Sequence, residues 1–143
     1  MLRSTLVDTL MSSPVVSARK SDTLTDAKVL MKEHSINHLP ILDENNAPIG
    51  MVSALDLNRL SDWRTRFKAL AKVGAKRDED LFDSLLIEEI MVSPVTCVHQ
   101  NATVKEVADL IEREGIHCVL IINEAGAAIG VLTAHDLLRI AYG

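Results

Sequence analysis

The sequence predicts an α+β fold in which two copies of one β-α-β-β-α unit pack together as a tandem module. Residues 11–60 and 91–140 align without a gap at an offset of eighty residues, and sixteen of the fifty positions are identical. Such a repeat indicates two copies of one supersecondary unit. Because a unit of about 50 residues buries too little apolar surface to be stable alone, we expect the copies to fold cooperatively.

The first copy is expected to begin with a short strand at Val15–Arg19. The residues Thr23 and Asp26 have the spacing of a capping box, in which a hydroxyl and a carboxylate satisfy the free N–H groups of a helix start. The helix is expected to end near Ser35. In the second copy the corresponding helix is expected to end at Gly115, a natural helix stop.

Two apolar runs follow, at His38–Leu42 and Pro48–Val52, and the turn residues between them predict a hairpin. A second helix is expected from Ser53. The second copy has the same pattern eighty residues later. We assign the first repeat to residues 7–62, a helical and charged linker to 63–82, and the second repeat to 83–143.

Three of the four aromatic residues lie in or beside the linker, at Trp63, Phe67 and Phe82. Trp63 and Phe67 are four residues apart and would share a helical face. We expect these side chains to cover the end of the core, and a partner-binding surface is the alternative.

The composition excludes several classes of protein. The net charge of −5 disfavours a nucleic-acid binder, and no apolar run reaches the roughly 18 residues of a membrane helix. Two cysteines are too few for a disulfide scaffold, so a cytoplasmic protein is expected. Residues 1–80 contain twelve Lys and Arg against eleven Asp and Glu, whereas residues 81–143 contain three against nine. A small anion should therefore prefer the first copy.

A hydroxyl residue stands at the expected start of each second helix, followed three residues later by an aspartate: Ser53 with Asp56, and Thr133 with Asp136. Free N–H groups at a helix start and a hydroxyl favour phosphate, and a carboxylate can accept hydrogen bonds from a ribose diol. The same spacing is also that of a capping box that needs no ligand.

An enzyme is not expected, because the sequence has no Gly-x-Ser-x-Gly elbow and no phosphate-binding glycine loop. Cys97, His99 and His117 could form a soft metal site. A buried free cysteine usually only fills space, so no metal or catalytic residue is assigned.

Three patterns resemble the CBS domain, a family in which two copies typically occur as a pair. They are Met-x-Ser-Pro-Val at Met11 and Met91, Ile-x-x-x-Pro-Ile from Ile36, and Ile-Gly-x-Val-Ser-x-x-Asp-Leu from Ile49. The resemblance implies adenine nucleotides or related ligands in clefts between the paired copies. It assigns the hydroxyl of Ser53 or Thr133 to phosphate and the carboxylate of Asp56 or Asp136 to ribose.

The resemblance further assigns an adenine wall and a polar group near the phosphates to Ile36, Asn37, His38 and Pro40, and in the second copy to Ile116 and His117. Cys118 replaces His38 there, and Leu120 replaces Pro40. Arg19 ends the first strand, where the second copy has His99. The first site is therefore expected to bind more tightly.

The main hypothesis is a stand-alone regulatory module that binds AMP, ADP, ATP or a related adenosyl ligand and needs no further cofactor. The alternative is a ligand-free module for dimerisation or protein docking. Apolar residues of the second helices, among them Leu57, Leu60, Leu137, Ile140 and Tyr142, predict a homodimer. A regulated protein partner is possible, while nucleic acid and membrane are not expected partners.

Overall fold

The computed structural model describes residues 5–60 and 78–142, and within them the α+β fold is confirmed. The chain divides into two compact units, and their boundaries do not follow the two sequence repeats. Unit 1 contains residues 1–15, 44–48 and 94–143, and unit 2 contains residues 16–43 and 49–93. Each unit therefore combines most of one repeat with the opening residues of the other.

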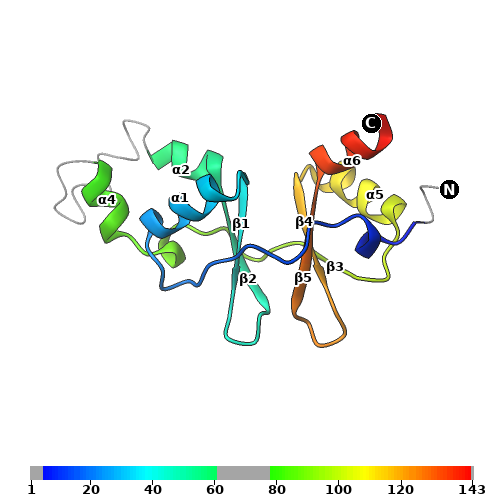
Figure 1. Ribbon diagram of the computed structural model, residues 1–143, viewed down its shortest axis with the longest axis horizontal. Helices are drawn as coiled ribbons and strands as arrows, with labels where there is room; N and C mark the ends of the chain where they lie inside the picture. The colour runs from blue at the N-terminus through cyan, green and yellow to red at the C-terminus, as the bar shows by residue number, and fades with distance from the viewer. Residues whose placement is uncertain (1–4, 61–77, 143) are drawn as a thin grey trace. The chain divides into compact units, whose positions relative to one another are not determined.

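Unit 2 consists of a hairpin with helices packed against one face (Figure 1). Its elements are α1 (Leu24–Glu33), β1 (His38–Leu42), β2 (Pro48–Ser53), α2 (Ala54–Leu60), α4 (Asp78–Ser84) and the 3₁₀ turn η3 (Ile87–Glu89). Leu39 and Ile41 lie on the same side of β1 and are fully buried in the core of unit 2, as is Leu24 of α1. Pro40 and Leu42, on the other side of this strand, are also buried.

Unit 1 contains a three-stranded sheet in the order β3-β4-β5, with β3 parallel to β4 and β4 antiparallel to β5. Its elements are the 3₁₀ turn η2 (Val7–Thr9), β3 (Cys97–His99), α5 (Val104–Glu114), β4 (Cys118–Ile122), β5 (Ala128–Thr133) and α6 (Ala134–Tyr142). Val119 and Ile121 of β4 pack with Val107 of α5 in the apolar cluster of this unit.

Both expected capping boxes are present at the starts of α1 and α5. The Thr23 hydroxyl accepts the Asp26 N–H at 3.2 Å, and the Asp26 carboxylate accepts the Thr23 N–H at 3.0 Å. Thr103 and Glu106 form the same pair of bonds at α5. The helix α5 ends at Glu114, and the C-cap Gly115 has the left-handed φ of 63° that favours glycine, as the sequence predicts.

The first strand of each copy differs from its expected length. The second copy forms β3 over three residues, whereas the first copy pairs only Ala18 with Ile41 of β1. In the second copy the Leu120 N–H donates to the Thr96 carbonyl at 3.1 Å. Pro40 occupies the position of Leu120 in the first copy and has no N–H to donate, so the equivalent bond cannot form.

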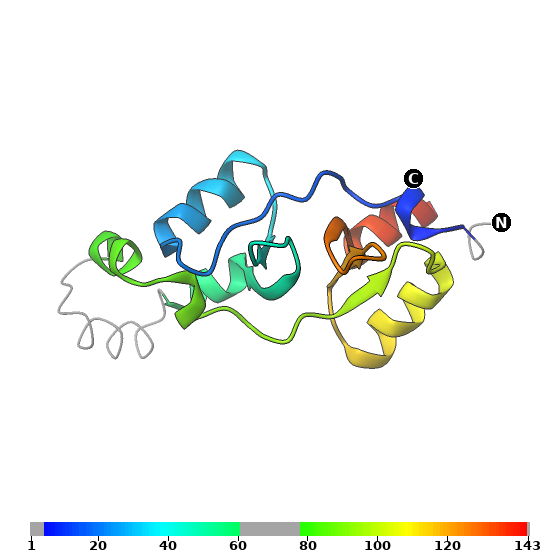
Figure 2. The ribbon, with the colours of Figure 1, turned by 90° about the horizontal axis from the view of Figure 1, so that it is seen from below.

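The residues that precede each repeat's first strand, 5–13 and 85–93, are called the leaders here. The first leader packs in unit 1: Val104 donates to the Thr5 carbonyl at 2.8 Å, and Val7 donates to the Ala102 carbonyl at 2.9 Å. Figures 1 and 2 both show these blue residues among the elements of the second repeat.

The second leader makes the same bonds in unit 2, eighty residues later. Leu24 donates to the Leu85 carbonyl at 3.0 Å, and Ile87 donates to the Asp22 carbonyl at 2.8 Å. The leaders are therefore exchanged between the repeats, and neither repeat contains all the residues of its own unit. This exchange supports the expectation that the copies fold together, which remains a prediction.

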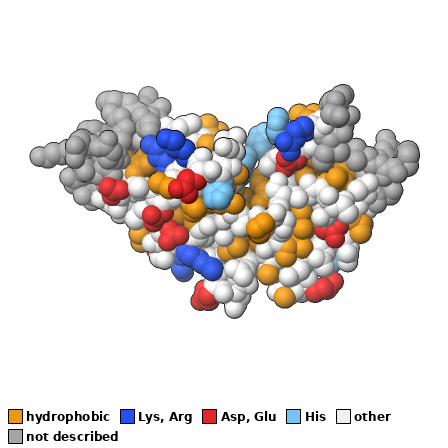
Figure 3. Space-filling model, viewed as in Figure 1, with side chains coloured by type: hydrophobic (Ala, Val, Ile, Leu, Met, Phe, Trp, Pro, Cys, Tyr) orange, Lys and Arg blue, Asp and Glu red, His pale blue; other side chains and the backbone are white. Residues whose placement is uncertain are grey.

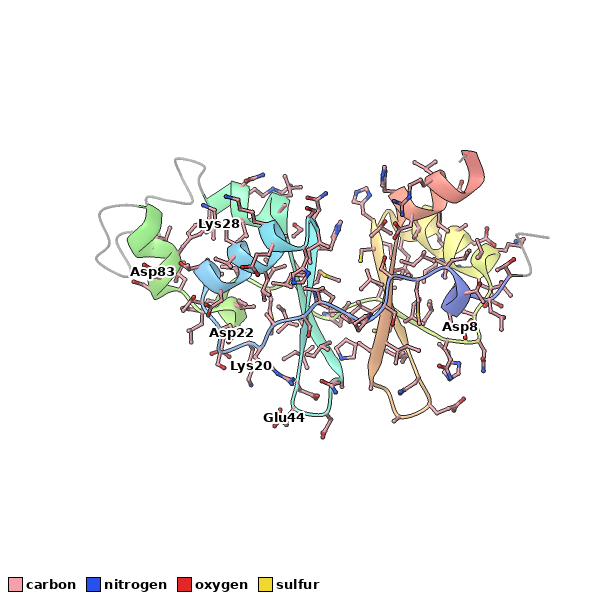
Figure 4. All side chains as sticks on the ribbon, in the orientation of Figure 1. Asp8, Lys20, Asp22, Lys28, Glu44 and Asp83 are labelled. Atoms are coloured by element: carbon pink, nitrogen blue, oxygen red, sulfur yellow. The ribbon has the colours of Figure 1, made fainter. Side chains whose placement is uncertain are left out.

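The helix α4 belongs to unit 2 and packs on α1. Figure 4 labels Lys28 on α1 and Asp83 on α4. The Thr25 hydroxyl donates to the Asp83 carboxylate, and the Lys28 ammonium lies 5.5 Å from the Phe82 ring centre. Phe82 is buried in the core of the unit, as expected. Trp63 and Phe67, with linker residues 63–77, lie outside the described residues.

Candidate functional site

The turn from β2 into α2 holds the first candidate site. Ser53 ends β2, and Asp56 lies in the first turn of α2. The Ser53 Oγ accepts the Asp56 N–H at 3.0 Å, and the Asp56 Oδ2 accepts the Ser53 N–H at 3.0 Å. Ala54 donates to the Asn37 carbonyl at 2.8 Å. The fold thus brings Asn37, Ser53 and Asp56 together from separate elements.

The cap leaves ligand-binding groups available on the same two side chains. The Ser53 Oγ uses a lone pair in the cap, so its O–H can still donate to an oxyanion. The Asp56 carboxylate uses Oδ2, and among the described residues no donor contacts Oδ1. A carboxylate oxygen has two lone pairs, so Oδ1 can accept bonds from a vicinal diol. Capping and ligand binding are therefore compatible in this turn.

The turn from β5 into α6 repeats the cap with the same lengths. The Thr133 Oγ1 accepts the Asp136 N–H and the Asp136 Oδ2 accepts the Thr133 N–H, both at 3.0 Å. Ala134 donates to the His117 carbonyl at 2.9 Å. Here, however, Arg139 Nη2 donates to Asp136 Oδ1 at 2.9 Å. The outer carboxylate oxygen of the second turn is already engaged.

Arg139 has no place in the sequence prediction. It follows Asp136 by three residues on a helix, a spacing at which opposite charges contact each other. The three-residue spacing is therefore the feature of the sequence from which the contact between Arg139 and Asp136 could have been predicted. Arg59 occupies the same position after Asp56, is exposed, and contacts no acidic group among the described residues.

The residue beside each turn also differs between the copies. Cys118 lies directly opposite Thr133 in the β4–β5 ladder. Burial, and secondly the negative charge of Asp136, raise the pKa of the Cys118 thiol to about 12. The thiol is therefore neutral at physiological pH. His38 occupies the equivalent position at the start of β1 and is half-buried.

Arg19 does not lie with the other predicted residues of the first site. Its backbone N–H donates to Asp22 Oδ2 at 2.9 Å, and its guanidinium donates to the carbonyls of Leu42, at 3.1 Å, and Asp43. Leu42 ends β1, whereas Asn37 and Ser53 meet at the start of that strand. The structure thus places Arg19 at the opposite end of β1, where its guanidinium supports a turn.

The remaining predicted residues lie near the two turns in the chain. Ile36 is partly buried against the core of unit 2, and Pro40 is buried within β1. Ile116 is partly buried against the core of unit 1, and His117 is exposed. Within the described residues, no group of three or more His, Cys, Asp and Glu side chains could hold a metal ion.

Comparison with known proteins identifies the family. The profile of the CBS domain matches residues 7–62 and 87–143. The chain therefore belongs to the CBS domain family, and both matched segments correspond to the two repeats.

A solved structure of the CBS domain of a membrane protein from Sphaerobacter thermophilus has a TM-score of 0.78 at 26% identity, covering 96% of this chain and 88% of that one. The CBS domain pair of protein MJ0100, solved with 5′-methylthioadenosine and S-adenosyl-L-methionine, has a TM-score of 0.77 at 25% identity, covering 96% and 95%. CBSX2, solved with AMP, shares the fold with a TM-score of 0.75 at 23% identity and 96% coverage of both chains.

Among curated proteins, L-aspartate semialdehyde sulfurtransferase of Methanocaldococcus jannaschii is 28% identical over 139 residues. The match covers 97% of this chain but 24% of that enzyme, so the chain spans about a quarter of its relative's length. The resemblance is therefore to one part of a longer protein.

Among the residues that the structure describes, no helix is both long enough and apolar enough to cross a membrane.

Proposed function

We propose that this chain is a regulatory module that binds an adenosyl ligand at the turn of Ser53 and Asp56. The observation that carries the proposal is the Oδ1 of Asp56, which no donor among the described residues contacts, beside the Ser53 hydroxyl. The carboxylate would accept the ribose hydroxyls, and the hydroxyl would donate to the phosphate or carboxylate of the ligand. The adenosyl ligands of the CBS pair of MJ0100 support this chemical class.

The start of β1 would complete the site. Asn37 is fixed to the turn through its carbonyl, and the neighbouring His38 and Ile36 would contribute a polar group and an apolar wall. The Thr133 turn would bind the same class of ligand less tightly, because Arg139 must first leave Asp136 Oδ1. The chain itself would carry no catalytic group, and the ligand would act as a signal.

Calorimetric titration with AMP, ATP, S-adenosyl-L-methionine and 5′-methylthioadenosine tests the proposal. At least one of these ligands should bind with an affinity that the Asp56→Ala substitution reduces. Inorganic phosphate and ribose, titrated separately, show whether one fragment alone accounts for binding. If none of the four adenosyl ligands binds or raises the melting temperature at millimolar concentration, the proposal is wrong.

A ligand-free docking or dimerisation module is the second candidate function. The complete caps favour it, because neither turn needs a ligand for its own hydrogen bonds. Exposed apolar side chains also favour it: Leu55 of α2 is 57% exposed, and Leu138 of α6 is 58% exposed. Figure 3 shows apolar side chains reaching the surface.

The apolar residues available for a homodimer differ from those predicted. Leu57 and Leu60 are each 7% exposed and belong to the core of unit 2, because they lie on the inward face of α2. Leu137 is partly buried against the core of unit 1. The side chains of Ile140 and Tyr142 lie outside the described residues. The homodimer remains a prediction, which light scattering tests against the 15.7 kDa mass of one chain.

A further inference from the structure

A methionine in each leader lies against a glycine in a strand. Gly50 of β2 and Gly130 of β5 are both buried. A Cβ added to Gly50 would lie less than 3.0 Å from the sulfur of Met91, and one added to Gly130 would also lie less than 3.0 Å from the sulfur of Met11. The thioether thus occupies the space that a side chain would otherwise fill. The same fitted contact occurs in both units.

Backbone hydrogen bonds join each leader to the same strand beside this contact. Ser12 and Val131 exchange two bonds, of 2.9 and 3.1 Å, next to Met11. Val92 and Met51 exchange two bonds, of 2.9 and 3.0 Å, next to Met91. Through these bonds the first leader pairs antiparallel with β5, and the second leader pairs antiparallel with β2. The methionine contact and the strand pairing therefore fasten the same few residues.

Both methionines are half-buried and pack against the apolar clusters of their units. A thioether suits this position because it is apolar, flexible and able to fill an irregular gap. A sulfoxide is polar and larger at the sulfur atom, which is the atom that touches the glycine. Oxidation therefore adds a polar oxygen to the atom that lies closest to the glycine, and this change disfavours the contact.

The repeat itself shows which methionine positions accept other side chains. Met31 and Met51 correspond to Ile111 and Val131 in the second copy, so a hydrocarbon side chain is accepted at those positions. The leader position is methionine in both copies, at Met11 and Met91.

We propose that Met11 and Met91 are paired modification sites, at which oxidation to the sulfoxide releases each leader from its strand. The oxidant is a peroxide. A sulfur lone pair attacks one peroxide oxygen, the S–O bond forms and the O–O bond breaks. The sulfur loses two electrons and, with hydrogen peroxide, the departing hydroxide takes the proton from the sulfur-bound oxygen and leaves as water. Reduction of the sulfoxide by a thiol-dependent reductase restores the thioether.

Release of the leaders would also affect ligand binding at the candidate sites, a consequence that rests on the proposed function. Met51 and Val131 lie two residues before Ser53 and Thr133 on the same strands. Loss of the leader would leave these strand ends without their pairing partner. Oxidation would then weaken ligand binding at both turns.

The test uses the full chain carrying Met31→Ile and Met51→Val, the residues that the second copy has at those positions. Graded hydrogen peroxide is applied, sulfoxides are located by peptide mass spectrometry, and amide hydrogen exchange is followed by NMR. Oxidised Met91 should raise exchange at residue 51 and Val92 by about tenfold or more. Oxidised Met11 should do the same at Ser12 and Val131.

Met91→Leu in this background is the matched control, because leucine has a similar volume and cannot be oxidised. It should abolish the peroxide effect at residue 51 and Val92 and preserve the effect at Ser12 and Val131. Unchanged exchange after full conversion of both methionines would overturn the proposal. A uniform rise that includes the amides of α1 and α5 would also overturn it, since it would indicate global unfolding. None of these readouts requires a bound ligand.

Discussion

The turns at Ser53 and Thr133 have the same cap but different surroundings. In both, two bonds of 3.0 Å, each from a backbone N–H to a side-chain oxygen, link the hydroxyl residue to the aspartate three residues on. Asp136 also accepts a bond from Arg139, whereas Asp56 has an outer oxygen that no described residue contacts. Duplication has thus preserved the backbone geometry, and the chemistry around the carboxylate is specific to each copy.

The strand residue beside each turn adds to the difference. Cys118 presents a neutral thiol, because burial and the Asp136 charge raise its pKa to about 12. His38 occupies the equivalent position and has an imidazole side chain, whose nitrogens form hydrogen bonds. The first copy therefore combines His38 with a carboxylate oxygen that no donor among the described residues contacts. The second copy combines Cys118, a weak donor, with a carboxylate that Arg139 engages.

The largest expected effect is a difference between Asp56 and Asp136 in their contribution to ligand affinity. Asp56→Ala should reduce the affinity for an adenosyl ligand by about ten- to hundredfold, because it removes charge-assisted bonds to ribose. Asp136→Ala should have a much smaller effect on the affinity of the tighter site. Calorimetric titration of both variants measures the difference.

Stability provides the control for this pair of variants. Each substitution removes the same cap bond, so each should destabilise the fold by about 1 kcal/mol, and Asp136→Ala also loses the exposed Arg139 contact, which contributes at most about 1 kcal/mol. Equal binding by the wild type and Asp56→Ala, with the expected loss of stability, would leave capping as the only role of Asp56.

The next prediction concerns the contact between a strand glycine and a leader methionine, which should contribute similarly to stability in both copies. Gly50→Ala and Gly130→Ala should each destabilise the fold by about 1–3 kcal/mol, because the new methyl group overlaps the leader methionine. Urea unfolding measures the change. The double variant Gly50→Ala/Met91→Ala should be less destabilised than the sum of its single variants. Strict additivity would show that Met91 is not the source of the clash.

The stability of the protein at alkaline pH should depend on Cys118, a residue of the second copy. The pKa of Cys118 is raised from its ordinary value of 9.0 to about 12. The folded state therefore favours the neutral thiol, and this contribution is present below pH 9 and is lost as the pH rises from 9 to 12. Between pH 8 and 10 the wild type should lose about 1 kcal/mol of stability relative to Cys118→Ala. Parallel pH dependence of the two proteins would contradict this assignment.

The smallest expected effect tests the Arg139 contact. The Arg139 side chain is 67% exposed, so its ion pair with Asp136 contributes at most about 1 kcal/mol. Arg139→Gln should accordingly tighten binding at the second turn by up to about fivefold. Arg59→Gln is the matched control and should not tighten binding at the first turn. An identical response to both substitutions would remove the proposed difference between the turns.

Local patterns were sufficient to predict most of the elements. The capping boxes at Thr23 and Thr103, the helix end at Gly115 and both hairpins follow from residue types at short spacing, and all are confirmed. The cap at Ser53 was also predictable, since its two partners are three residues apart. The role of these residues in ligand binding remains a proposal.

Other features depend on contacts that no local pattern specifies. The shortened first strand of the first copy results from the missing N–H of Pro40, which matters only once its parallel partner is known. Arg19 was placed near the candidate site because it ends that strand. The parallel direction instead brings it to the carbonyl of Leu42. The leader exchange is equally long-range, because the spacing of residues within one repeat does not specify which repeat a leader binds.

The exchanged leaders also affect the order in which the protein can fold during its synthesis. Unit 2 needs residues 85–93, so it cannot be complete when the first repeat leaves the ribosome. The first leader must wait even longer, until Val131 has been made. At about 5–20 residues per second, that delay is roughly 6–24 s. Throughout this interval the apolar residues of the first leader lack their strand, and a chaperone could bind them.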